Sequence, residues 1–193
     1  MKREAVILFL LFTLSKLVVA ADVVWYDGSV VLDNKSVHQG KISIEHDLVL
    51  LKSGEHVDVL PAHKLQSVFY YDQRANINRR LVSIQGSSFF ERARLYEIVL
   101  IGNASILRRS KTGIHHPQSD ALDFEYFTMV EEKLVPLNKF RKKVFPTLLN
   151  DAGLALKVYV KENRLNPNVS ANAIRITQQY NVIKKSEQLM ASQ

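Results

Sequence analysis

Short apolar stretches alternate with turn residues along the first two thirds of the chain. In Lys41–Glu45 and His56–Leu60, apolar and polar residues alternate with a period of two, which predicts strands with one buried face. Leu48–Leu51 is apolar throughout, which predicts a strand covered on both faces. Further strands are predicted at residues 29–33, 65–71, 80–85, 95–101, 104–107 and 123–129. No helix-length pattern separates these segments, so we expect an antiparallel sheet or a small barrel.

Turn residues mark the ends of these strands. Asp27-Gly28, Ser53-Gly54-Glu55 and Gly102-Asn103 have the composition of tight turns. Pro61 ends a strand because it lacks the N–H group that a sheet ladder needs. The polar segment Arg108–Asp120 predicts an exposed loop between two strands. Longer loops are often functional, so an enzyme site at this loop is one hypothesis.

The last third of the chain changes to the period of helices. Phe140, Val144 and Leu148 recur at intervals of four after Asn138, which is a candidate N-cap. Pro146 should kink or divide this helix, because proline cannot continue the helical hydrogen bonds.

Two further helices follow in the pattern. The second is predicted over residues 150–165, with Leu154, Val158 and Leu165 on one side. The third begins at Ser170, which can cap it. The apolar residues that recur along the third helix are Val169, Ala173, Ile176, Tyr180 and Ile183.

The two parts of the pattern together predict an α+β fold. We expect an N-terminal antiparallel β-sheet or small barrel in a β-rich region at 21–136, followed by C-terminal amphipathic helices at 137–193. The 193 residues are 47% apolar and 23% charged, an ordinary globular composition. This length suits one domain, so we expect the helical region to pack on the β-rich region.

The first 20 residues have the outline of a secretory signal peptide. Lys2-Arg3 precedes an apolar run at 5–14, and Val18–Ala21 supplies the small residues that a signal peptidase recognises. A retained membrane anchor is the alternative, but Ser15-Lys16 interrupts the run before the roughly 20 apolar residues that span a bilayer. We therefore expect cleavage near Ala20 and export.

The absence of cysteine excludes several chemistries. A chain without cysteine has no disulfide, no thiolate metal site and no cysteine nucleophile. A domain of this size buries enough surface to be stable without disulfides. An exported protein without cysteine fits a bacterial location, so we expect it to be periplasmic, cell-surface or secreted.

Charge is divided unevenly along the chain, whose formal net charge is +7. Residues 21–132 hold 12 Lys plus Arg and 15 Asp plus Glu, a net charge of −3, whereas residues 133–193 hold 11 and 3, a net charge of +8. The candidate interaction surface consists of Lys139, Lys142, Lys143, Lys157, Lys161 and Arg164. Its candidate partners are an anionic membrane surface, an acidic polysaccharide or an acidic protein, because export argues against nucleic acid. The alternative is that these side chains only form the solvated face of amphipathic helices.

Familiar catalytic and cofactor motifs are absent from the sequence. It contains no Gly-x-Gly, no Gly-Lys-Ser/Thr, no Gly-x-Ser-x-Gly and no His-Glu-x-x-His. We therefore predict no catalytic residue, no cofactor and no metal. The six histidines are His38, His46, His56, His63 and the adjacent His115-His116, which point to no shared ion. Asp120, Asp123 and Glu125 form either paired carboxylates or the polar face of a strand.

An aromatic group offers a further candidate surface. Its members are Trp25, Tyr26, Phe69, Tyr70 and Tyr71, with Arg74, Arg79 and Arg80 nearby. Such a group can stack on a sugar ring or a peptide. The alternative is that the aromatic residues pack beneath the C-terminal helices, and consecutive aromatics cannot all point into one core.

Several stretches carry a resemblance to a group of proteins. They are Trp25–Leu32, the step from Pro61–Lys64 into Phe69–Asp72, Pro136–Lys143 and the final Gln179-Tyr180-Asn181. Over most of the chain that follows the signal segment, they look like uncharacterised small exported proteins of Bacteroidota-type bacteria. The resemblance implies export and an order of strands followed by helices, and it supplies no activity, ligand or catalytic residue.

These observations favour a non-catalytic exported binding or structural protein of the bacterial periplasm or cell surface. The alternative is a peripheral envelope-associated protein that contacts anionic lipid or polysaccharide through its basic helices. An enzyme is the third hypothesis. The oligomeric state is open.

Overall fold

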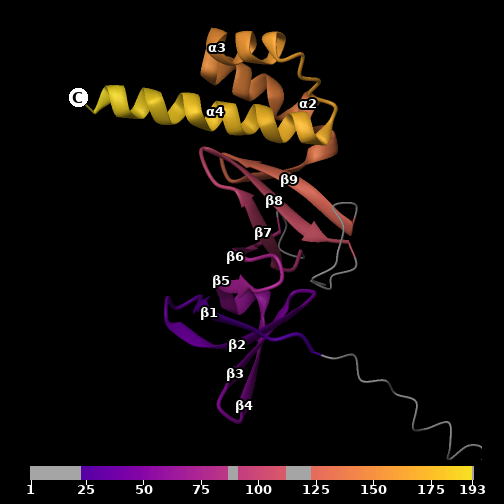
Figure 1. Ribbon diagram of the computed structural model, residues 1–193, viewed down its shortest axis with the longest axis vertical. Coiled ribbons are helices and arrows are strands. Elements are labelled where there is room, and N and C mark those ends of the chain that lie inside the picture. The colour runs from indigo at the N-terminus through magenta and orange to yellow at the C-terminus, as the bar shows by residue number, and fades with distance from the viewer. Residues whose placement is uncertain (1–22, 87–90, 112–122, 193) are drawn as a thin grey trace, which may run out of the picture.

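The computed structural model describes residues 23–86, 91–111 and 123–192. Over these residues ten strands form one antiparallel sheet, with the helices gathered at one end of the molecule (Figure 1). The strands lie in the order β10-β9-β8-β7-β6-β5-β1-β2-β3-β4. Their bounds are β1 Tyr26–Leu32, β2 Val37–Glu45, β3 Leu48–Ser53, β4 His56–Pro61, β5 Leu65–Asp72, β6 Ile77–Ile84, β7 Arg94–Leu100, β8 Ala104–Ser110, β9 Phe124–Val130 and β10 Lys133–Pro136. The predicted α+β class is confirmed, and the sheet is not closed into a barrel.

Each predicted strand is present with shifted ends, but three details of the strand prediction are wrong. In β3, Val49 and Leu51 are buried while Leu48 is exposed and Leu50 is only partly buried, so one face of the strand is covered and not both. Gly28 lies inside β1 rather than in a turn. A Cβ atom at Gly28 would lie 2.2 Å from the carbonyl oxygen of Phe69, so the close approach of β5 requires glycine. The four-residue strand β10 was not predicted.

The helical region contains more breaks than its sequence pattern indicates. Its elements are the 3-10 turn η3 Leu137–Lys139 and the helices α2 Phe140–Lys143, α3 Phe145–Glu162 and α4 Ser170–Ala191, and a further 3-10 turn, η1 Ala62–Lys64, precedes β5. Pro146 lies in the first turn of α3 and separates it from α2, as predicted. Asn138 lies within η3 and is not the N-cap of α2, which is Lys139. Ser170 is likewise the first residue of α4, whose N-cap is Val169.

The inner side of α3 differs from the predicted side. Ala152 and Leu156 are buried, whereas Leu154 is 74% exposed and Val158 is 40% exposed. Leu148, Ala152 and Leu156 recur at intervals of four past Gly153, whose φ of 58° and ψ of −138° are not helical. Leu154 is two residues from Leu156 and therefore lies on the opposite side of the helix. The predicted side is wrong at Leu154 and Val158, whereas Leu165, which follows the helix, is buried.

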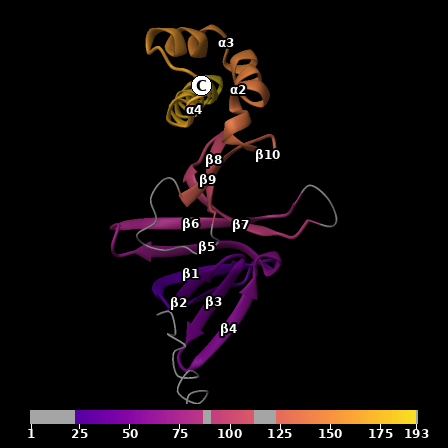
Figure 2. The same cartoon turned by 90° about the vertical axis from the view of Figure 1, so that its right-hand side faces the viewer.

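Two apolar cores lie on the same face of the sheet. The first is formed by β1 to β7 and the second by β8, η3 and the helices. Leu81 in the first core lies opposite Glu97, and Glu97 lies opposite Arg108. Ile106, two residues from Arg108 and therefore on the same face, belongs to the second core. Figure 2 shows the helices above β8 and β9, with β1 to β4 at the far end.

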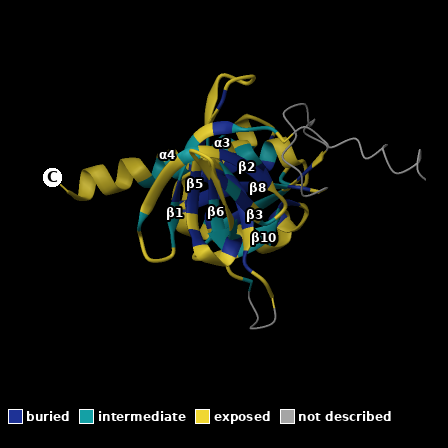
Figure 3. Ribbon diagram, turned by 90° about the horizontal axis from the view of Figure 1, so that it is seen from below, coloured by how far each residue is buried: buried dark blue, intermediate teal, exposed yellow. Residues whose placement is uncertain are grey.

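Asn181 fixes α4 to the sheet. Its side-chain oxygen accepts a hydrogen bond from the Ala104 N–H at 2.9 Å, and its amide nitrogen donates to the Ala104 carbonyl at 2.7 Å. One amide side chain thus satisfies both backbone groups at the start of β8. Beyond this point α4 projects from the body and is exposed, as Figure 3 shows.

Candidate functional site

A row of four charged side chains crosses the sheet between the two cores. We call Asp72, Arg79, Glu97 and Arg108, on β5 to β8, the charged row. Arg79 donates to Asp72 at 2.8 Å and to Glu97 at 2.6 Å. Arg108 donates to both carboxylate oxygens of Glu97, at 2.8 and 3.0 Å. The two carboxylates are buried and the two guanidinium groups are mostly covered. Negative and positive side chains alternate along the row.

The surroundings of the charged row favour the ionised forms of Asp72, Arg79 and Arg108. Burial acts to raise the pKa of Asp72, but hydrogen bonds from Arg79 and from the Ala75 backbone hold it below its ordinary value. Burial acts to lower the pKa of Arg79 and of Arg108, and Glu97 raises both above the ordinary value. Each charge of the row therefore lies against one of opposite sign, and removal of one member would leave a covered charge without its partner.

Two arginines assigned to the predicted loop at Arg108–Asp120 lie in β8, so this part of the prediction is wrong. Arg108 belongs to the charged row and also covers the ring of Phe124 at 4.1 Å. Arg109 pairs with Asp47 at 2.9 Å, and Asp47 accepts the Leu95 N–H at 2.9 Å. These ion pairs with Glu97 and Asp47 hold Arg108 and Arg109 in the extended conformation of β8. Residues 112–120, with His115, His116 and Asp120, lie outside the described residues.

The other titratable candidates are dispersed over the surface. His56 contacts Asp58 at 3.0 Å, and His38 contacts Ser36 at 3.0 Å. Within the described ranges, no three metal-ligating side chains gather to hold an ion. Asp123 and Glu125 are exposed while Phe124 between them is buried, which is the alternation of a strand face.

The aromatic candidates are divided between the two faces of the sheet. The rings of Tyr26 and Tyr70 meet in the first core with their centres 4.7 Å apart. Phe69 and Tyr71 point to the outer face, where the guanidinium of Arg80 lies 4.9 Å from the Phe69 ring centre. Trp25 is half-buried, Arg79 belongs to the charged row, and the Arg74 N–H binds Asp72. The structure does not gather these residues into one stacking surface.

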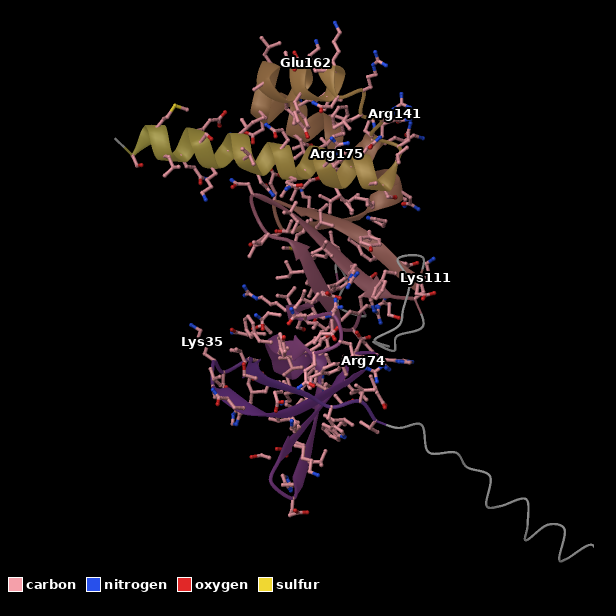
Figure 4. All side chains as sticks on the ribbon, in the orientation of Figure 1. Lys35, Arg74, Lys111, Arg141, Glu162 and Arg175 are labelled. Atoms are coloured by element: carbon pink, nitrogen blue, oxygen red, sulfur yellow. The ribbon has the colours of Figure 1, made fainter. Side chains whose placement is uncertain are left out.

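The predicted basic residues all lie exposed at the helical end, in two sets. Lys139, Lys142 and Lys143 lie on η3 and α2, and Lys157 and Lys161 lie on α3, with Arg164 just after α3. In the part of the chain that the structure describes, none of these six side chains forms an ion pair. Figure 4 shows charged side chains, among them Arg141 and Glu162, around this end. This cationic surface is the candidate functional site.

One face of α3 combines cations with apolar side chains. Leu154, Lys157, Val158 and Lys161 follow at i, i+3, i+4 and i+7, so they share one side of the helix. All four are exposed, and we call them the outer α3 face. In Figures 1 and 2, α4 lies between α3 and the sheet, so α3 forms the outermost layer of the helical end.

No family model, curated protein or solved structure matches the chain. None of the described helices is long and apolar enough to cross a membrane.

The charged row and the outer α3 face were both missed by sequence reasoning. A signal for the first exists: Arg79 alternates with Leu81 at period two, so it occupies a position on the buried face. A signal for the second is the series Leu148, Ala152 and Leu156, which recurs at intervals of four and leaves Leu154 on the opposite side of the helix.

Proposed function

We propose that this protein is an exported, non-catalytic binding protein of the bacterial envelope, and that its helical end contacts the anionic headgroups of a membrane surface. The observation that carries the proposal is the outer α3 face, where two exposed apolar side chains alternate with two lysines. Interfacial helices place apolar side chains at the boundary of the acyl chains while lysines remain among the phosphates.

Electrostatics supports the same contact. Each lysine or arginine near an anionic membrane contributes about 1 kcal/mol, and the attraction decays over a Debye length of roughly 8 Å at physiological salt. The six exposed cations of the site have no acidic partner in the described chain, so their charge is free to act on a surface. The association should therefore weaken as salt rises.

Export is part of the proposal and rests on the sequence. The basic start, the apolar run and the small residues that end near Ala20 support a cleaved signal peptide. Lack of cysteine supports a bacterial periplasm or cell surface. Mass spectrometry of the protein purified from a bacterial host tests this step, and a chain that still begins at Met1 would contradict it.

The test of membrane contact is vesicle flotation with the chain that begins at Ala21. We expect binding to vesicles that contain phosphatidylglycerol, no binding to phosphatidylcholine alone, and release at high salt. The variant Lys139→Glu/Lys142→Glu/Lys143→Glu should lose binding. The matched control is Lys35→Glu/Lys52→Glu/Lys64→Glu, which makes the same change in net charge with exposed lysines of the sheet region. Equal binding by both triple variants would refute the proposed site.

A second pair of variants separates lipid from polysaccharide. Leu154→Ser/Val158→Ser removes the apolar side chains of the outer α3 face and leaves every charge in place. We expect it to weaken vesicle binding. If this variant and the unmodified protein bind vesicles equally, the apolar side chains of the outer α3 face do not contact the membrane. If the unmodified protein binds an acidic polysaccharide but not vesicles, the partner is the polymer and the membrane proposal is wrong.

A further inference from the structure

Strand β4 forms one edge of the sheet. Among the residues that the structure describes, it pairs with β3 alone, and its residues 56–59 are all exposed. The β3–β4 hairpin lies at the end of the molecule opposite the helices (Figure 1). Natural sheets shield their edges with lysine, proline, bulges or a covering element. In β4 the only residues of this kind are Asp58, which carries a carboxylate, and Pro61, at the end of the strand.

Strand β10, at the other edge of the sheet, has features that protect an edge from pairing with another chain. Strand β10 has four residues, begins with Lys133 and ends with Pro136, and leads directly into η3. Strand β4 has six residues and no lysine. Its side chains Val57 and Val59 are 42% and 59% exposed on the outer face, beside the partly exposed Leu50. The β10 edge is therefore short and bears lysine and proline, whereas the β4 edge is longer and bears two exposed valines.

The geometry of the hairpin determines which backbone groups are free. Ser53 and His56 lie opposite each other across the two-residue turn Gly54-Glu55, and Gly54 has the positive φ of 61° that such turns require. Residues that flank a two-residue turn exchange hydrogen bonds, and bonded pairs alternate along the strand. The N–H and C=O groups of Val57 and Val59 therefore point away from β3.

We propose that two copies of this chain pair through β4, antiparallel about a two-fold axis, with Val57 opposite Val57 of the partner subunit. In this register His56 lies opposite Asp58 of the partner subunit, and the reverse pair forms on the other side of the axis. The outward N–H of each Val57 then donates to the Val57 carbonyl of the other copy. Backbone pairing supplies the contact, and the two His–Asp pairs select the register.

Two neighbouring registers of the β4–β4 pairing, centred on Asp58 and on Val59, are less favourable. A shift that centres the axis on Asp58 places two carboxylates opposite each other. A shift that centres it on Val59 places Val57 opposite Pro61 of the partner subunit, which has no N–H to donate. The chain is thus self-complementary in one register, and an isologous dimer requires such a self-complementary surface.

Because the chain has no cysteine, single cysteines report the register directly. Val57→Cys places two sulfur-bearing residues opposite each other with Cα atoms about 5.5 Å apart, within the range of a disulfide. Val59→Cys places them four residues out of register, roughly 13 Å apart along the strands, which a disulfide cannot span. We expect mild oxidation to cross-link Val57→Cys and not Val59→Cys, although Val59 is the more exposed of the two. The reverse result, or equal cross-linking, would overturn the proposal.

Sedimentation of the cysteine-free protein tests the pairing without a cross-link. We expect a dimer whose dissociation constant rises about tenfold or more in His56→Asp, because two carboxylates then lie opposite each other, and also rises in Asp58→Lys, because His56 then loses its carboxylate partner. The double variant His56→Asp/Asp58→Lys should restore the dimer. The control Val37→Lys changes an exposed valine away from this edge, on β2, and should not affect dimerisation. A monomer at every concentration, or single variants that dimerise normally, would overturn the proposal.

Discussion

Basic residues have different surroundings at the two ends of the molecule. In the sheet, three arginines, Arg79, Arg108 and Arg109, are mostly covered and held against carboxylates. At the helical end the basic residues are largely lysines that face solvent, such as Lys142 and Lys157. A planar guanidinium suits fixed, partly buried pairs, whereas a flexible ammonium group suits solvent and changing partners. The same type of charge therefore serves stability in one region and is left available for contact in the other.

The largest effect should follow from breaking the charged row. Glu97→Ala leaves Arg79 and Arg108 mostly covered and without their shared carboxylate, so we expect a loss of about 3–5 kcal/mol in the free energy of unfolding. Urea denaturation followed by circular dichroism measures it. Glu125→Ala, on the exposed side of β9, is the matched control and should change the free energy by less than about 0.5 kcal/mol. Similar losses in the two variants would mean that the row does not stabilise the sheet.

A pair of leucines in α3 separates packing from surface within the helical end. Leu156 is completely buried and Leu154 is 74% exposed. We expect Leu156→Ala to lower the free energy of unfolding by about 2–5 kcal/mol, because it opens a cavity in the second core. Leu154→Ala should leave the stability within about 0.5 kcal/mol of the unmodified protein. Thermal melting of both variants side by side provides the measurement, and a larger loss in Leu154→Ala would contradict the assigned faces.

Lowering the pH should reduce the free energy of unfolding through Asp72 in the sheet more than through Asp151 at the helical end, and both effects should be smaller than those above. The folded-state pKa of Asp72 lies below its unfolded value, so its contribution to stability is present above about pH 4 and is lost as pH falls through the folded pKa. Asp72→Asn should therefore flatten the acid side of the stability profile. Asp151, at the helical end, also has a lowered pKa, through hydrogen bonds from Tyr180 and Lys184, but it is largely solvent-exposed. Asp151→Asn should change the profile less, as urea midpoints from about pH 7 to about pH 2.5 would show.

Local pattern predicted most of the sheet because each strand carries its own period. The alternation at Ile42 and Ile44, and the turn at Gly54, are visible within a few residues. The charged row is not, because its partners lie on four different strands and meet only once the strand register is set. Alternation could place Arg79 on a buried face but could not name Asp72 and Glu97 as its partners.

The sequence predicted which cationic residues form the candidate site, but it did not predict how they are arranged on the helices. The cations of the helical region follow from counting, and all six are exposed. Their division into two sets depends on the break between α2 and α3 beside Pro146. Leu154 was assigned to the wrong side because two apolar series recur at intervals of four in this segment, and the buried one is Leu148, Ala152 and Leu156. The close approach of β1 and β5 at Gly28 was not predicted, because a glycine beside an aspartate also suggests a turn.

The strand order also bears on how the chain folds. Every pair of neighbouring strands in the sheet is consecutive in the chain except β1 and β5, which are separated by three strands and η1. Eight of the nine pairings therefore join strands that are consecutive in the chain, and one pairing alone requires the closure of a segment that contains other strands. Gly28 sits in that pairing, at the point where a side chain would collide with β5. We therefore expect the rate of folding to depend on this single junction, with Gly28→Ala slowing it while substitutions in the hairpins act mainly on unfolding.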